Sequence, residues 1–470
     1  MRRAPIIAIV LGIATSGCTL TPDYTRPVNA LANSSLANGP LDSDVPHSSE
    51  EAISGSWWRI YNDPLLNNLV DESLRSNTDM RVALANLRGA SGGLDVASDA
   101  QLPQVEVGAS TNYARDSAEE VLRPGPLPNE RVYAVLGAVS YEVDLFGRVK
   151  RSIESADATV EAAKASLAAT HIAVAAETVA AYLSVCSAGR EATVTQRAIA
   201  IQVEETQLTR KLFAGGRTGS LDVTRSFTQE QSLRASLPPL EAAKRTSLNR
   251  LAVLTGQPVG NLPPAVVACN DEPKLDRVIP VGDGQSLIKR RPDIALAEHQ
   301  LHRATAQYGV AKADLYPSIS FGASGGSVGL LGHFNDDDTY KFSIGPLISW
   351  HFPNRRRALG QLTEAQAQID AAFARFDAQV LVALDEVQSA LAVYGHDLDR
   401  MSDLQMARSS AAKASSDART LYAFGRGNYL SVLDADRQLT SLEQLIAAQQ
   451  TKISGDQVQM FLALGGGWQE

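Results

Sequence analysis

The sequence has few cysteines, few aromatic residues and no hydrophobic run long enough to cross a membrane as a helix. Its 470 residues include 3 Cys and 7 His, and only 6% are aromatic. The one uninterrupted apolar stretch, residues 6–14, is shorter than the roughly 20 residues of a transmembrane helix. No zinc-type cluster, nucleophile–base pair or phosphate loop is present, so the sequence indicates a protein that is not an enzyme.

Basic residues are also too few for a nucleic-acid-binding protein. There are 43 Lys and Arg against 52 Asp and Glu, a net charge of −9, whereas phosphate binding needs a basic face. Alanine is abundant over long stretches, and 44% hydrophobic with 20% charged residues is typical of a folded chain. Composition therefore predicts an acidic, helical protein, and the length allows about three domains.

The N-terminus has the features of a bacterial lipoprotein signal. Arg2 and Arg3 precede the apolar run, and the small residues 15–17 come directly before Cys18. This order resembles a lipobox, and Thr19 in place of Asp favours the outer membrane as the destination. We expect a signal peptide at 1–17 and a covalent lipid, palmitate among its acyl chains, on Cys18; an ordinary signal peptide with an incidental cysteine is the alternative. With 41 basic and 52 acidic residues left, the mature chain carries a net charge of −11.

The two other cysteines, Cys186 and Cys269, would be in an oxidising compartment. They could pair, but sequence cannot establish that their Cα atoms come close enough. Cys186 lies in the apolar segment 181–186, which favours the role of a small buried side chain. We assign neither cysteine a redox function.

An internal repeat organises the rest of the chain. Residues 87–110 align with 301–324 at a shift of 214, and residues 212–217 align with 421–426 at a shift of 209. The expected divisions are a signal peptide (1–17), an acylated tether (18–56), repeat 1 (57–256), a proline-rich connector (257–284), repeat 2 (285–466) and a tail (467–470).

Each repeat is expected to contain one very long helix, at 148–214 and 355–424. The first has no proline and one glycine in 67 residues, and would be about 100 Å long. Both contain small and apolar residues at alternating spacings of three and four, the seam of a coiled coil, although ordinary bundle packing could give the same pattern. The segments 65–102 and 221–254 predict helices of about half that length.

Four segments alternate apolar and polar residues, at about 104–113, 131–143, 318–327 and 340–350. Such segments are the weak signature of a transmembrane β-barrel, or of an ordinary antiparallel sheet. Four strands cannot close a barrel, so several chains would have to share one. Two chains would give eight strands, whose interior is nearly filled by side chains. Three chains would give twelve strands, with room for a lumen.

With these features in place, the sequence resembles the TolC-like outer membrane factor family, in particular its lipoprotein branch of NodT/OprM-type efflux proteins. The resemblance covers nearly the whole mature chain. It depends on five motifs: Trp57-Trp58…Asp63-Pro64-Leu65, residues 141–148 (YEVDLFGR), Arg290-Arg291-Pro292-Asp293, residues 313–317 (ADLYP) and residues 427–437 (GNYLSVLDADR).

The resemblance implies a mainly α fold with a small β part: a TolC-like helical barrel joined to a shared β-barrel with four strands per protomer. It implies a homotrimer anchored in outer membrane lipid and extending into the periplasm. The expected partners are a periplasmic adaptor (membrane fusion protein) and an inner-membrane RND-type pump, with passive export of drugs or other small molecules. Apart from the lipid on Cys18 no cofactor is expected, and no metal or nucleic acid.

In this family inward-facing residues near the helix turns close the periplasmic end. The positions that match this gate are Tyr422, Leu430, Asp434, Asp222 and Arg437, and the matching turn tips are Gly215, Gly216, Gly425 and Gly427. Three copies of Asp434 near one axis would attract cations, and a Leu430 ring could exclude water. The alternative is a surface ion pair between Asp434 and Arg437, three residues apart.

Two other functions compete with the efflux channel. The first is the outer membrane component of a type I protein secretion system, which shares the duct fold; the second is a soluble periplasmic coiled-coil scaffold. His299 and His302, three residues apart, could be read as a ligand pair, but no further ligands accompany them and we do not expect a metal there.

Overall fold

The computed structural model describes residues 22–35, 37–41, 48–49, 55–119, 122, 124–275, 279–350 and 355–466. The expected signal peptide, Cys18 and the tail 467–470 lie outside these described residues. The chain forms two compact units, and each takes segments from both repeats. Unit 1 comprises Met1–Pro27, Leu87–Ala163 and Leu296–Phe376, and unit 2 comprises Val28–Asn86, Lys164–Ala295 and Asp377–Glu470.

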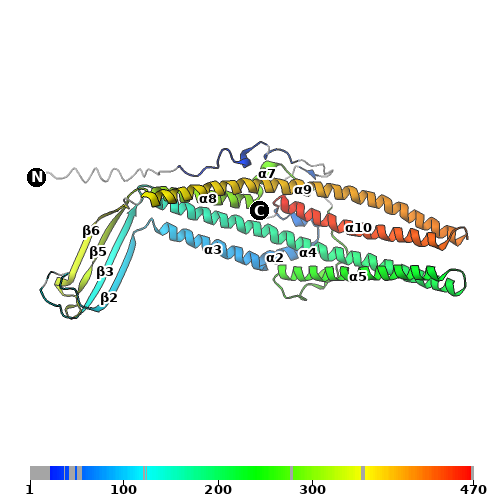
Figure 1. Ribbon diagram of the computed structural model, residues 1–470, viewed down its shortest axis with the longest axis horizontal. Helices are drawn as coiled ribbons and strands as arrows, with labels where there is room; N and C mark the ends of the chain where they lie inside the picture. The colour runs from blue at the N-terminus through cyan, green and yellow to red at the C-terminus, as the bar shows by residue number, and fades with distance from the viewer. Residues whose placement is uncertain are drawn as a thin grey trace. The chain divides into compact units, whose positions relative to one another are not determined.

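Unit 1 contains a four-stranded antiparallel sheet in the order β2-β3-β5-β6 (Figure 1). Its strands are β2 (Gln104–Ala114), β3 (Glu130–Val143), β5 (Ser318–Leu330) and β6 (Tyr340–Ser349). All four expected strands are confirmed, each boundary to within three residues. Among the described strands β2 and β6 each pair on one side only, so the sheet has two open edges.

Two very long helices are present, α4 (Arg148–Ala214) with 67 residues and α9 (Arg355–Ala423) with 69. Both were expected from the sequence. Some positions of their predicted seams are buried, for example Val160 of α4 and Ala372 and Phe376 of α9, and the remaining seam positions are partly buried. Part of α4 is apolar enough to qualify as a membrane span, but most of that stretch is buried inside the fold, so packing accounts for its composition.

The shorter helices are α2 (Pro64–Ser76), α3 (Thr78–Asp99), α5 (Ser220–Leu254), α6 (Pro264–Val267), α7 (Gly284–Arg290), α8 (Pro292–Ala313) and α10 (Tyr429–Ala463). The prediction of one continuous helix over 65–102 was wrong, because the chain breaks at Asn77. This residue has an extended backbone, and its side-chain oxygen accepts the N–H of Asp79 at 2.7 Å. Its amide donates to the carbonyl of Leu254 at 3.1 Å, so Asn77 caps α3 and also satisfies the end of α5.

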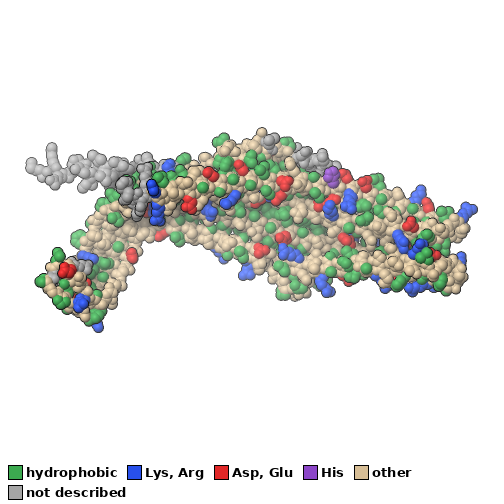
Figure 2. Space-filling model, viewed as in Figure 1, with side chains coloured by type: hydrophobic (Ala, Val, Ile, Leu, Met, Phe, Trp, Pro, Cys, Tyr) green, Lys and Arg blue, Asp and Glu red, His purple; other side chains and the backbone are tan. Residues whose placement is uncertain are grey.

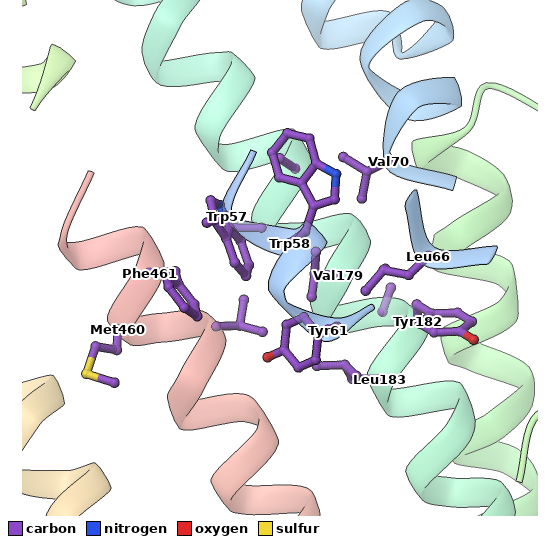
Figure 3. Packing of buried hydrophobic residues seen from close by; sticks show 14 of the residues in the cluster. Trp57, Trp58, Tyr61, Leu66, Val70, Val179, Tyr182, Leu183, Met460 and Phe461 are labelled. Atoms are coloured by element: carbon purple, nitrogen blue, oxygen red, sulfur yellow. The ribbon is translucent and has the colours of Figure 1, made fainter. Parts of the chain in front are cut away.

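The core of unit 2 forms around the tryptophan motif of the N-terminal segment. Trp57, Trp58 and Tyr61 lie in a short 3₁₀ helix (Trp57–Tyr61) and are at most 3% exposed (Figure 3). Trp57 stacks on Phe461 of α10 with ring centroids 4.4 Å apart. Asp63 then accepts the first N–H groups of α2 and the hydroxyl of Tyr182 on α4 at 2.7 Å. The motif therefore joins α2, α4 and α10.

The Arg290-Arg291-Pro292-Asp293 motif caps the C-terminal end of α10. Arg290 donates to the carbonyl of Leu464 at 2.6 Å, and Arg291 donates to that of Ala463 at 2.9 Å. Carbonyls at a helix C-terminus lack partners and carry partial negative charge, so two guanidinium groups stabilise this end. Asp293 in turn holds the Arg291 guanidinium by an ion pair at 2.5 Å.

Cys186 and Cys269 form a disulfide across 83 residues of sequence, with Cα atoms 4.8 Å apart. Cys186 is fully buried in α4, as its apolar surroundings predicted. The favoured interpretation of Cys186 as a small apolar side chain alone is nevertheless corrected, because the connector returns to α4 and places Cys269 within bonding distance. That return is a long-range contact, which local sequence does not record.

Candidate functional site

Two glycine-containing turns connect α4 to α5 and α9 to α10 within unit 2. The four expected tip residues all lie in them: Gly215, Gly216, Gly425 and Gly427. Gly216 and Gly425 have φ of 68° and 71°, a left-handed conformation that favours glycine. In both turns the following residue donates its N–H to the carbonyl five residues earlier, at 2.9 Å. The two repeats thus build the same turn.

The expected gate residues Leu430 and Asp434 lie one turn apart at the start of α10, and both are exposed. Asp434 makes no ion pair among the described residues, so the alternative pairing with Arg437 is not found. Arg437 instead donates to the backbone carbonyl of Arg225 on α5, at 3.2 Å. Arg437 therefore connects the first helices after the two turns, and leaves the Asp434 carboxylate to solvent.

The other two expected gate residues lie beside the turns. Asp222 is half-buried in the first turn of α5, where its carboxylate accepts the hydroxyl of Thr218. A carboxylate is favourable there because the N-terminal end of a helix carries partial positive charge. Tyr422 packs against Tyr429 across the second turn, with ring centroids 5.4 Å apart. The fold thus places all five expected gate residues within about three helical turns of the two tips.

A charged network that the sequence did not predict lies next to these residues. The guanidinium of Arg419, near the end of α9, donates to Asp436 of α10 at 2.9 Å and to Glu205 of α4 at 3.1 Å. Ser415 donates a further hydrogen bond to Asp436. The side chains of Asp436 and Glu205 are only 11% and 14% exposed, so both carboxylates depend on Arg419. The network attaches the second turn to α4.

A signal for this network was present in the sequence. Asp436 follows the buried Val432 and Leu433 at spacings of four and three, which places a carboxylate on the apolar face of α10. A charged residue at such a position requires a partner on a facing helix. Which helix faces α10 depends on the tertiary fold, so the pattern alone could not supply Arg419 or Glu205.

The pKa of Glu205 is raised to about 7. Burial is the main cause and the neighbouring Asp436 the next, while Arg419 opposes them. Its ordinary value is 4.5, so the fold favours the protonated acid. In the folded protein Glu205 therefore gains its negative charge around pH 7 and not around pH 4.5.

His299 and His302 of α8 belong to unit 1, whereas the two turns belong to unit 2. His302 stacks on Tyr24 with ring centroids 4.4 Å apart, and its Nε2 lies 2.9 Å from the carboxylate of Glu154. Burial lowers the pKa of His299. In the described part of the chain, no group of three or more His, Cys, Asp and Glu side chains could hold a metal ion. His302 helps to hold the N-terminal segment.

Comparison with known proteins assigns the chain to a family. The sequence model of the family described as "Outer membrane efflux protein" matches residues 69–257 and 284–466. The chain belongs to this family. The two matched ranges also show that the family domain is duplicated, once in each repeat.

Relatives and solved structures agree with this assignment. The toluene efflux pump outer membrane protein TtgC of Pseudomonas putida is 29% identical over 99% of this chain and 95% of its own. The outer membrane protein OprJ of Pseudomonas aeruginosa is 27% identical, covering 99% of this chain and 96% of its own. The structure of the outer-membrane channel OprN matches with 32% identity and a TM-score of 0.88, over 96% of this chain and 100% of that one.

The efflux protein described here is therefore the outer membrane channel of an efflux pump and not an enzyme. Its fold is the TolC-like channel fold expected from the motifs, mainly helical with four antiparallel strands. The CusC structure, with 24% identity and a TM-score of 0.81 over 96% of this chain, has the same fold.

Proposed function

We propose that three copies of this efflux protein share one membrane-spanning β-barrel of twelve strands. The observation that carries the proposal is the four-stranded sheet with open edges at β2 and β6. In lipid an open edge leaves N–H and C=O groups without partners, and four strands cannot close on themselves. Pairing β6 of one copy with β2 of the next removes every edge, and twelve strands enclose a lumen.

The two faces of the sheet support this arrangement. The strand register places Val107 in one row with Phe342, and Val105 in a row with Ile344 two residues further along the strands. These four side chains are between 70% and 86% exposed, and all lie on one face. The opposite face carries Glu106, Ser324, Ser343 and Lys341. On the side of the strands that is visible in Figure 2, charged side chains lie mainly near the two ends of the strands, and few lie between these ends. We assign the apolar face to lipid and the polar face to the lumen.

The helices would extend the channel into the periplasm. A continuous helix of about 100 Å is far longer than the roughly 30 Å hydrocarbon core of a membrane. In this proposal the helical end meets a periplasmic adaptor and an RND-type inner-membrane pump. The cargo is drugs or other small molecules, in line with the toluene, solvent and antibiotic efflux named for its relatives.

The residues around the two turns would form the periplasmic gate. Leu430 and Asp434 are exposed on one side of α10, so threefold symmetry can bring three copies of each around one axis. Tyr422 and Asp222 lie beside the two turns, Arg437 attaches α10 to α5, and the tip glycines allow the tight reversals. Three carboxylates at one constriction favour cations over anions.

Neutralising both acidic gate residues, with Asp222→Asn and Asp434→Asn together, should reduce cation selectivity. Loss of about 1 kcal/mol of attraction at the constriction corresponds to a roughly fivefold lower cation-to-anion permeability ratio. Reversal potentials in planar bilayers under a salt gradient measure this ratio. The control Asp403→Asn removes an exposed carboxylate of α9 far from the turn and should leave the ratio unchanged. Equal ratios in all three proteins would refute the gate assignment.

The N-terminal segment supports lipid anchoring at Cys18, which itself lies outside the described residues. Asp23 lies 3.3 Å from Lys150 and 3.2 Å from Arg151, in the first turn of α4 just after β3. Five residues of chain span at most about 17 Å. A lipid on Cys18 would therefore enter the membrane near the level at which the strands end.

Native mass spectrometry of the detergent-extracted protein tests the trimer and the anchor together. We expect three copies, each with the added mass of its acyl chains. Cys18→Ser should lose that mass and keep the trimer, since the barrel and not the lipid holds the copies together. Cys269→Ser, the matched control, should retain the acyl mass. A monomeric wild type would exclude the shared barrel, and an acyl mass in Cys18→Ser would exclude the lipobox.

We also propose the division of the chain into the signal peptide (1–17), tether (18–56), repeats (57–256 and 285–466), connector (257–284) and tail (467–470). The ranges matched by the family model support the two repeats. The protein would thus be an outer membrane lipoprotein whose helical part lies in the periplasm.

A further inference from the structure

The connector between the repeats makes a cluster of buried contacts that do not involve the expected gate residues. Its residues 269–272 lie against α4 and α5 of repeat 1 and α10 of repeat 2, all within unit 2. The disulfide joins Cys269 to Cys186, which is fully buried in the middle of α4. This short segment is therefore covalently fixed to one helix and surrounded by two others.

The first contact around the disulfide is unusually close. A Cβ atom at Gly189 of α4 would lie 2.4 Å from the carbonyl oxygen of Cys269 and 2.5 Å from the side-chain oxygen of Asn270, so only glycine fits. Lys244 of α5 donates to the same two oxygens, at 3.0 Å and 2.9 Å. The connector is thus seated directly on the α4 backbone and held there by α5.

The second contact is a buried ion pair that reaches the other repeat. The carboxylate of Glu272 is 2% exposed and lies 2.9 Å from the guanidinium of Arg190 on α4. Ser454 of α10 donates a hydrogen bond to the same carboxylate. Arg190 also donates to the carbonyl of Ala447 on α10, at 3.1 Å. Glu272 therefore completes a bridge from α4 to α10.

We propose that the Cys186–Cys269 disulfide is an interlock, that is, a covalent bond that keeps the buried contacts between repeat 1 and repeat 2 in place. Cys269 is three residues before Glu272, so the disulfide holds the Glu272 carboxylate where it bridges Arg190 and Ser454. Since α4 ends at the first turn and α10 begins at the second, the interlock couples the helices that lead to the two tips. Oxidation closes it: two thiols become one disulfide, and two electrons and two protons pass to a disulfide-bearing thiol oxidase of the periplasm.

Amide hydrogen exchange on the assembled, detergent-extracted protein tests the interlock. In Cys269→Ser we expect exchange to quicken about tenfold both in α4 around residues 184–193 and in α10 around residues 447–456. Glu272→Gln should quicken exchange in the α10 segment to a similar degree while the disulfide stays intact. The matched control Glu443→Gln removes the charge of one partner of a surface ion pair with Arg408 and should leave both segments unchanged.

If the cysteine variant does not assemble, the wild type after reduction of its assembled form provides the same comparison. Faster exchange confined to the connector, with α10 unaffected, would overturn the proposal. So would a Glu272→Gln protein whose α10 exchanges as slowly as the wild type. Amide exchange measures the coupling between helices and not ion conduction, so its result does not depend on whether the gate assignment is correct.

Discussion

Arg419→Ala is expected to weaken the attachment of the second turn to α4 by about 2–3 kcal/mol and so to increase leakage through the channel. The substitution removes the guanidinium that lies within 3.1 Å of both Asp436 and Glu205. Glu205 then stays protonated at neutral pH, because Arg419 no longer lowers its pKa, and the largely buried Asp436 loses its counter-charge. Uncompensated buried charge is costly, although the 53% exposure of Arg419 reduces the effect below that of a fully buried pair. A change of this size shifts a two-state equilibrium by roughly 30- to 150-fold.

Uptake of an antibiotic too large for ordinary porins measures this leak in whole cells, and single-channel recording measures it directly. The control is Arg408→Ala, which removes an arginine from the same pair of helices. Arg408 and its partner Glu443 are 49% and 40% exposed, so the loss should be within about 1 kcal/mol and the leak unchanged. Equal uptake by the Arg419→Ala and Arg408→Ala cells would show that the network does not restrain the turn.

The pH dependence of the same network gives a second measurement. A carboxyl group whose pKa is higher in the fold than in the unfolded chain costs stability once the unfolded chain ionises. For Glu205 this cost appears above pH 4.5 and is complete near pH 7, so stability from this group decreases as pH rises through that window. Glu205→Gln should remove the decrease, and denaturant unfolding at several pH values shows whether it does.

The sequence predicted the features that depend on local pattern. Periodicity and the absence of proline located α4 and α9 almost to the residue, because the many residues of a long helix all show the same helical periodicity. Period-two alternation located all four strands. The paired glycines located the turns, since a left-handed backbone conformation leaves few alternatives.

Features that depend on packing between distant segments could not be predicted in this way. The break at Asn77 is favoured by a hydrogen bond to Leu254, which is 177 residues away in the sequence. The disulfide partner of Cys186 is 83 residues away, and Glu205 meets Arg419 across 214 residues. In each case the tertiary fold determined which two residues meet, and the local sequence pattern could not supply the pairing.

Ile344→Arg is expected to prevent assembly of the barrel almost completely. Ile344 is 77% exposed on the apolar face of β6, near the middle of the strand. An arginine facing the middle of the membrane costs about 2–4 kcal/mol, and a trimer carries three, a total of about 6–12 kcal/mol. Total stability of an ordinary protein is of similar size, so inserted channels should not survive. Heat-modifiable oligomers in outer membrane fractions measure the outcome.

Ser343→Arg is the matched control, because it places the same charge one residue earlier on the same strand. The register puts Ser343 in a row with Ser324 and Glu106, on the face that we assign to the lumen. An arginine there stays in water and should cost the barrel little, although it should lower the cation preference. Normal assembly of the Ile344→Arg protein would place that face away from lipid. Failure of both variants would mean that β6 tolerates no large side chain, and the assignment of the two faces would then lose its support.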